Sequence, residues 1–165
     1  MHDRNGHRND IDELADLIKG IHTAMLTTRS GEGRLVSRPL TTREVSDDGV
    51  LFFLTSIDSK KVHELAGDPC VNLSYVDDGR YVSVDGRAEV VRDQSKIDQL
   101  WNESFDSLYF PKGRTDPDLV VLRVIAQTAE VWTSSGTHIG RAFDFLKAKL
   151  THDPKAMGEQ RHYER

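Results

Sequence analysis

The chain has 165 residues, of which 22 are Lys or Arg and 27 are Asp or Glu, so its formal net charge is −5 at pH 7. With 37% hydrophobic residues, 12 glycines and 5 prolines, the composition excludes a disordered, collagen-like or disulfide-scaffolded protein and predicts one globular domain. The acidic balance argues against a nucleic acid as the main partner, because binding to the phosphate backbone depends on clustered positive charge.

The sequence also lacks the patterns of membrane and secreted proteins. No apolar stretch approaches the roughly 20 residues that a membrane-spanning helix needs, and the first ten residues carry no apolar signal segment. The single cysteine, Cys70, lies between Pro69 and Val71 and is interpreted as a small core residue without a chemical role. We therefore expect a cytoplasmic protein without a membrane partner.

The N-terminal part of the chain predicts one helix after a polar start. Residues 1–9 are polar, and we expect them to be disordered. Over residues 10–21 the apolar side chains recur with the helical period. Asp10 followed by Glu13 resembles a capping box, which predicts that the helix starts there.

Short runs rich in β-branched and aromatic residues follow, separated by clusters of Gly, Asp, Ser and Asn, as is typical of successive antiparallel strands. The predicted strands are 23–29, 35–44, 50–55, 71–76, 80–92, 119–126 and 129–133. Further helices are predicted at 59–66, 93–105 and 139–150. This order indicates a mainly β fold with peripheral helices, in particular a small barrel, as a single domain over residues 10–150 with a loose polar tail at 151–165.

The common catalytic motifs are absent from the sequence. There is no GxGxxG, Walker loop, GxSxG or HExxH pattern. The seven histidines never stand at i and i+4 or beside paired cysteines, so no metal site is predicted.

The segment with the clearest functional pattern is the start of the helix predicted at 59–66. Ser59, Lys60 and Lys61 occupy its first turn, where free backbone amides carry partial positive charge and bind anions. Two lysines at this end oppose the helix dipole, a conflict that a bound phosphate would relieve. In the alternative interpretation, Ser59 is a simple N-cap and both lysines lie in solvent. The sequence fits an anion site and this structural role equally well.

A second cation, Arg38, precedes Pro39 in the strand predicted at 35–44. Strand alternation places Val36, Arg38 and Leu40 on one face, and Pro39 indicates an edge strand or an irregularity. If this strand lay beside the strand at 50–55, Arg38 could join the anion site as a bidentate donor. The alternative is a surface arginine on an edge strand.

Together these residues resemble a known family. The stretch FFLTSIDSKKVHEL at 52–65 is similar to the phosphate-binding stretch of the pyridoxamine 5′-phosphate oxidase-like flavoproteins. The motifs SRPL at 37–40, YVSVDGRAEV at 81–90 and WN at 101–102 are similar to the general stress protein 26-like branch of that family. The resemblance spans residues 11–150.

The resemblance implies an FMN-binding split β-barrel that works as a homodimer with the flavin at the subunit interface. By that analogy the phosphate is held by Arg38, Ser59, Lys60 and Lys61. The ribityl chain and the ring would be lined by Pro39, Leu40, Leu54, Thr55 and Ser56. The partner subunit would contribute Tyr81, Ser83 and Trp101, although Trp101 fits equally well as an anchor for its own helix.

The resemblance further implies a flavin-dependent oxidoreductase of the general stress protein 26 type, with FMN or alternatively FAD, and with a small molecule as electron donor or acceptor. The C-terminal QRHYER lacks the Arg-x-His element with which true pyridoxamine phosphate oxidases hold their substrate, so oxidation of vitamin B6 is not expected. No catalytic acid, base or nucleophile is identified. A non-catalytic flavin binder, acting as a sensor, carrier or scavenger, and a deazaflavin- or haem-binding relative are the alternatives.

Overall fold

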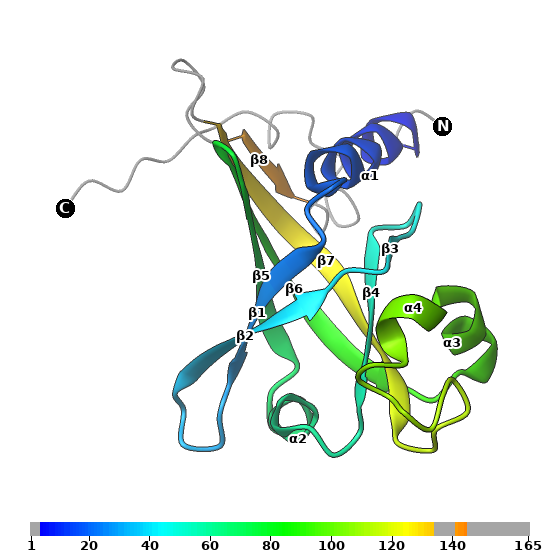
Figure 1. The fold of residues 1–165 in the computed structure, drawn as a ribbon. Helices are drawn as coiled ribbons and strands as arrows, with labels where there is room; N and C mark the ends of the chain where they lie inside the picture. The colour runs from blue at the N-terminus through cyan, green and yellow to red at the C-terminus, as the bar shows by residue number, and fades with distance from the viewer. Residues whose placement is uncertain (1–3, 134–140, 145–165) are drawn as a thin grey trace.

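The computed structural model describes residues 4–133 and 141–144, which form one curled antiparallel sheet with helices around it (Figure 1). Its strands are β1 (Thr23–Arg29), β2 (Leu35–Thr41), β3 (Glu44–Val45), β4 (Val50–Ser56), β5 (Cys70–Asp77), β6 (Arg80–Val91), β7 (Leu119–Thr133) and β8 (Arg141–Asp144). Its helices are α1 (Arg4–Ile18), α2 (Lys60–Gly67), α3 (Gln94–Leu100) and α4 (Glu103–Asp106). The predicted class, mainly β with peripheral helices, is confirmed.

The strand order places the predicted edge strand at one end of the sheet. The order is β2-β1-β5-β6-β7-β4-β3, and β8 pairs with β7 off this path. β2 pairs only with β1, as Pro39 predicts for a strand that cannot donate a full ladder of hydrogen bonds. β4 pairs with β3 and β7, so the condition considered for Arg38, a place beside β4 in the sheet, is not met.

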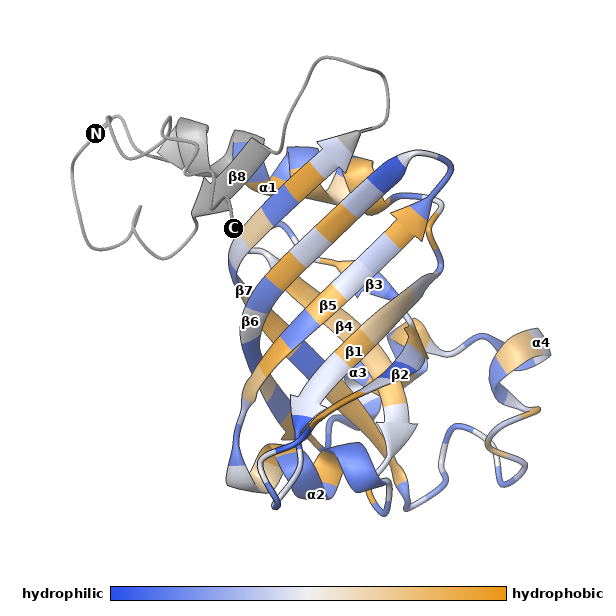
Figure 2. Cartoon of the chain, turned by 90° about the vertical axis from the view of Figure 1, so that its left-hand side faces the viewer, coloured by the Kyte–Doolittle hydropathy of each residue, from blue (hydrophilic) through white to orange (hydrophobic). Residues whose placement is uncertain are grey.

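Side chains alternate along the strands between a buried inner face and a more polar outer face (Figure 2). The inner faces of the central strands meet in the main core, where Leu26, Leu73 and Val84 are fully buried. α1 closes one end of the curled sheet with residues such as Leu14, and α2 closes the other end with Leu65 (Figure 1). The end that α2 covers is the end that carries the predicted anion-binding residues.

A second, smaller core packs α3 against the strands β4 and β7. Its buried members are Leu54, Ile97, Leu100, Leu119 and Val121. Phe52, Trp101 and Phe110 pack against them as partly buried residues. The apolar residues that predicted a helix over 93–105 therefore do pack against the sheet. The chain forms two short helices there, α3 and α4, instead of one.

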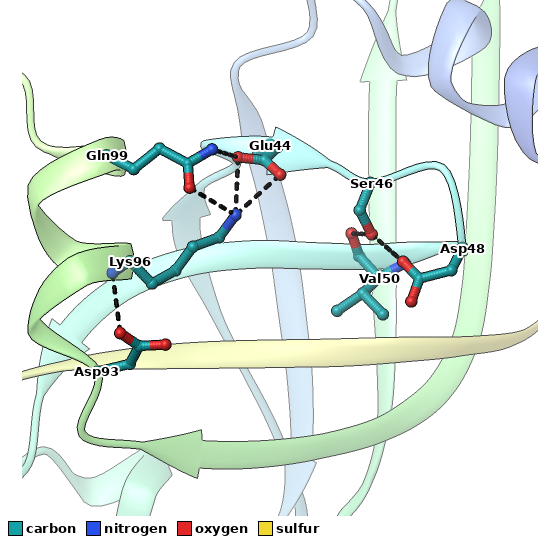
Figure 3. A network of polar contacts seen from close by, with 7 residues as sticks. All are labelled: Glu44, Ser46, Asp48, Val50, Asp93, Lys96 and Gln99. Carbon is teal, nitrogen blue, oxygen red and sulfur yellow. Dashed lines mark hydrogen bonds and ion pairs between the residues drawn. The ribbon is translucent and has the colours of Figure 1, made fainter.

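Polar contacts fasten both of these helices to the segment that follows β2. Glu44 accepts hydrogen bonds from Lys96 Nζ at 2.9 Å and from Gln99 Nε2 at 3.1 Å (Figure 3). Arg43 pairs with the Asp106 carboxylate of α4, and the Asp106 side chain is only 1% exposed. Two adjacent residues of the chain thus hold α3 and α4 in place.

A glycine is required where β6 and β7 change register. The pairing shifts between Asp85 and Gly86, because Asp85 lies opposite Thr128 and Gly86 lies opposite Ala126. A Cβ atom at Gly86 would stand 2.6 Å from the carbonyl oxygen of Ile125, which is closer than packed atoms allow. The predicted break between two strands at residues 126–129 is therefore an irregularity within the single strand β7.

The structure corrects three further expectations. α1 begins at Arg4, so the helix takes in residues 4–9, and Asp10 lies inside it rather than at a capping box. Cys70 is exposed and not a core residue. Residues 141–144 form β8 instead of part of the helix predicted at 139–150, because the end of β7 offers them an edge for pairing.

The other residues of the predicted helix at 139–150 and the tail at 151–165 lie outside the described residues. Among the helices that are described, none has the length and apolar character needed to cross a membrane.

Candidate anion-binding site

A tight turn joins the end of β4 to the start of α2. The backbone amide of Ile57 donates to Asp118 O at 2.8 Å, and the amide of Asp58 donates to Ser56 Oγ at 3.3 Å. The amide of Ser59 donates to Ser56 O at 3.2 Å, which closes the turn. These bonds fix the entry of the chain into α2, so the first helical turn has a defined direction.

Ser59 stands at the N-cap of α2, but its side chain does not act as a cap. Its backbone is extended, with φ −70° and ψ 146°, and its hydroxyl makes no bond to the backbone amides of the first turn. The Oγ atom is buried and has no hydrogen-bond partner in the part of the chain that the structure describes. A buried polar atom without a partner costs about 1 to 3 kcal/mol, so the serine favours a ligand oxygen at this point over a purely structural cap.

Four charged side chains interact with one another around the first two turns of α2. Arg38 Nη2 donates to Glu64 Oε2 at 2.7 Å, in a pair whose side chains are 20% and 13% exposed. Lys60 and Lys61 interact electrostatically with the same pair. Three cations therefore lie around the Glu64 carboxylate, and with the second carboxylate, Asp58 in the turn just before Ser59, one positive charge is left in excess at the start of α2.

The charges in this cluster shift the pKa values of Lys61 and Glu64. Burial lowers the pKa of the Lys61 ammonium, and the nearby Arg38 guanidinium lowers it further against the opposing effect of Glu64. The hydrogen bond from Thr28 lowers the pKa of the Glu64 carboxyl, and Arg38 adds to this effect while burial opposes it. An anion bound among these groups would favour the charged form of Lys61.

Thr28 and Glu64 belong to the site, although sequence reasoning missed both. Thr28 Oγ1 donates to Glu64 Oε2 at 2.6 Å and accepts a hydrogen bond from Arg38 Nη1. Glu64 follows Lys60 by four residues, a spacing that places the two on one helix face and could have indicated it. Thr28 had no comparable signal, because its approach to Arg38 depends on the pairing of β1 with β2.

Comparisons with known proteins identify the family of the chain. Residues 9–155 match the family described as pyridoxamine 5′-phosphate oxidase like. The chain belongs to this family. The predicted split-barrel fold is also confirmed by similar solved structures. The predicted branch is confirmed as well, since solved structures at 26% and 25% identity include a protein assigned as general stress protein 26 and one assigned to the general stress family.

Three relatives show the range of similarity. A protein related to general stress protein 26, from Clostridium acetobutylicum, has a TM-score of 0.70 at 18% identity and covers 86% of this chain and 98% of its own. A general stress FMN/FAD binding protein from Xanthomonas citri has a TM-score of 0.65 at 25% identity, over 78% and 91%. The protein bli-3 of Neurospora crassa is 26% identical over 162 residues, covering 92% of this chain and 78% of the relative.

The residues predicted to line a ring lie on β2 and β4, but their side chains face different ways. Pro39 lies opposite Met25 and is exposed on the outer face, whereas Leu40 points inward against the main core. Leu54 is buried in the second core, and Thr55 is buried as well. Ser56 is the last residue of β4, and its hydroxyl accepts a hydrogen bond from the amide of Asp58 in the turn before α2. Leu54 therefore serves packing in this chain, and a ring contact from its side chain stays a prediction.

Tyr81 and Ser83 lie on the outer face of β6, away from the inner face to which Arg38 belongs. Tyr81 pairs with Val76 near the end of β5, six residues or about 20 Å along the strand from its start beside α2. Ser83 accepts a hydrogen bond from Asn72 Nδ2 at 2.7 Å. A single chain thus does not bring these two residues to the cluster around Arg38.

Trp101 occupies the C-cap of α3, between α3 and α4. Its ring packs against the second core, and its Nε1 donates to Glu103 Oε2 at 2.7 Å. These contacts fit the interpretation of Trp101 as a helix anchor, and its predicted contact with a flavin held mainly by the partner subunit stays a prediction.

No cluster of three metal-binding side chains occurs within residues 4–133 and 141–144.

Proposed function

We propose that this chain binds a flavin through the terminal phosphate, with FMN as the main ligand and FAD as the alternative. The observation that carries the proposal is the buried Ser59 Oγ, which has no partner among the described residues, at the positively charged start of α2. A phosphate monoester supplies both things that this site lacks, namely acceptor oxygens and close to two negative charges. The name of the Xanthomonas citri relative, an FMN/FAD binding protein, supports the same ligand class.

Each residue of the cluster has a distinct role in holding the phosphate. The Ser59 hydroxyl and the free backbone amides of the first turn donate to its oxygens. Arg38 presents a planar guanidinium suited to two parallel bonds, while Lys60 and Lys61 act as point charges. Lys60 is exposed and Lys61 is half-buried, so Lys61 is the less screened of the two.

We propose further that two copies of the chain form a homodimer and that each flavin lies between them. Apolar side chains are exposed on the outer face of the sheet, where Val76, Tyr81 and Trp132 form one row by register and Met25 lies opposite Pro39. Covering such a face removes apolar surface from water. The partner would then contribute Tyr81, Ser83 and Trp101 to a ring whose phosphate is held by α2.

The proposed activity is that of a flavin-dependent oxidoreductase of the general stress protein 26 type with a small-molecule electron donor or acceptor. A bound flavin supplies hydride and electron transfer, and the chain supplies binding, orientation and electrostatic stabilisation. Ser59, Lys60, Lys61 and Arg38 are suited to binding a phosphate, and none of them is a recognised catalytic acid, base or nucleophile for a substrate. This favours flavin binding as the primary property and makes a sensor, carrier or scavenger without turnover the second candidate.

The test begins with the absorbance spectrum of the purified protein, followed by titration with FMN and with riboflavin. We expect FMN to bind tightly and riboflavin, which lacks the phosphate, to bind at least tenfold more weakly. Equal affinity for the two ligands, or no binding of either, would overturn the proposed site, and a Soret band would indicate haem instead.

Turnover and assembly are tested separately. Anaerobic addition of NADH or NADPH to the flavin-loaded protein should reduce the flavin, and a small-molecule acceptor should reoxidise it. A flavin that stays oxidised with every donor would favour the non-catalytic binder. Analytical ultracentrifugation should show a dimer, and a flavin-loaded monomer would contradict the proposed interface.

A further inference from the structure

Thr28, Arg38 and Glu64 form a closed set of hydrogen bonds where β1, β2 and α2 meet. Glu64 Oε2 accepts from Thr28 Oγ1 at 2.6 Å and from Arg38 Nη2 at 2.7 Å, and Arg38 Nη1 donates to the same threonine hydroxyl. The Thr28 side chain belongs to the core and is 1% exposed. The carboxylate is therefore anchored from inside the barrel, independently of anything that binds at the surface.

We propose that Glu64 and Thr28 are positioning residues that orient Arg38 toward the phosphate of the ligand. This inference rests on the proposed function. An arginine has five N–H donors in a rigid plane, and the bonds to Thr28 and Glu64 engage one donor on each terminal nitrogen. The donors that remain keep a fixed direction, so the side chain loses little further freedom when it binds an anion.

The opposite interpretation is that Glu64 merely repels the phosphate. A carboxylate beside an anion site lowers affinity through its charge, whereas a carboxylate that holds an arginine in place raises affinity through geometry. The two effects have opposite signs when the side chain is truncated. The anchoring by buried Thr28 favours the geometric role, because Glu64 has a second bond that keeps it in place when Arg38 engages a ligand.

The test compares two substitutions that remove the same charge. Glu64→Gln keeps an acceptor oxygen for Thr28 and Arg38, while Glu64→Ala removes it. We expect Glu64→Ala to weaken FMN binding about tenfold, and Glu64→Gln to bind FMN at least as tightly as the wild type. Riboflavin, which has no phosphate, should bind all three proteins equally. A merely structural role would move the affinities for both ligands together.

The arginine background supplies the matched control. In Arg38→Ala protein, the further change Glu64→Ala should not weaken FMN binding, because there is no guanidinium left to orient. Tighter FMN binding by Glu64→Ala in the wild-type background would overturn the positioning role and assign Glu64 a purely repulsive one. An equal loss of affinity in both backgrounds would overturn it as well.

A second pair of variants covers the case in which Glu64→Ala does not fold. Thr28→Val removes the hydroxyl at similar volume and should weaken FMN binding about threefold, while Thr28→Ser keeps the hydroxyl and should not. Equal FMN affinities for the Val and Ser variants would refute the inference. Failure of wild-type protein to bind FMN would instead refute the proposed function, so the two failures can be told apart.

Discussion

Removing two cations of the cluster is the most direct perturbation of the proposed site. Arg38 is mostly buried and would make charge-assisted bonds to a phosphate, which are worth about 1.5 to 3 kcal/mol. Lys60 is exposed, so its attraction is screened and amounts to about 0.5 to 1 kcal/mol. We therefore expect the double variant Arg38→Ala and Lys60→Ala to lose about 2 to 4 kcal/mol of FMN binding, or about 30-fold to nearly 1,000-fold in Kd.

Isothermal titration calorimetry at about 0.15 M ionic strength measures this loss. The matched control replaces Lys112 and Arg114 by Ala, because both residues are exposed in the loop after α4 and the total charge changes by the same amount. The control should bind FMN within about twofold of the wild type, since neither residue belongs to the Arg38 cluster and exposed charges are strongly screened at this ionic strength. Raising the salt concentration should weaken FMN binding to the wild type more than to the double variant.

An unchanged FMN affinity in the double variant would refute the placement of the phosphate at the start of α2. Arg38→Ala also leaves Glu64 without its cationic partner, so the free energy of unfolding of each variant has to be measured without ligand. A loss of FMN affinity that the control shares would show a general effect of net charge. Either result would remove the basis for assigning this cluster to a ligand.

Two further predictions concern pH and stability. Because burial and Arg38 lower the pKa of Lys61, FMN affinity should be full while Lys61 is protonated and should fall with rising pH earlier than an ordinary lysine would cause. Lys61→Arg keeps its charge throughout and should show no such fall in a pH series of titrations. Asp106→Ala leaves the mostly buried Arg43 unpaired and should lower the free energy of unfolding, measured in urea, by about 3 to 5 kcal/mol. The control Glu89→Ala breaks an exposed pair and should lower it by less than about 1 kcal/mol. A similar loss of stability in both variants would contradict this account.

Most of the sheet could be predicted from sequence because its strands carry local signals. β1 has the predicted bounds, and Gly33, Gly49 and Gly79 adopt the positive φ that tight turns demand. The predictions of secondary structure failed where tertiary contacts determine which element forms. The spacing of apolar residues after 138 fits a helix, yet residues 141–144 pair with β7 because an unpaired strand edge is available to them. The polar residues 4–9 gave no amphipathic signal, although α1 includes them.

Only the part of the candidate site that is contiguous in sequence could be predicted. The hydroxyl and the two lysines of the first turn of α2 are adjacent in sequence, so their pattern was readable. Arg38 joins them through α2 and not through the predicted neighbouring strand, because its side chain points into the end of the barrel. Thr28 and Glu64 could not be assigned, since a threonine in a strand and a glutamate in a helix are ordinary until the sheet curls and brings them together.

The attachment of α3 and α4 through Arg43 and Glu44 links two regions that are distant along the chain. Only Thr42 separates them from the end of β2, and Trp101 and Asn102 connect the two helices that they hold. A shift of β2 at Pro39 would therefore be transmitted to the indole through a segment of only a few residues. In the proposed dimer, the strand that carries Arg38 and the tryptophan offered to the partner's flavin would thus be tied to one short stretch of chain.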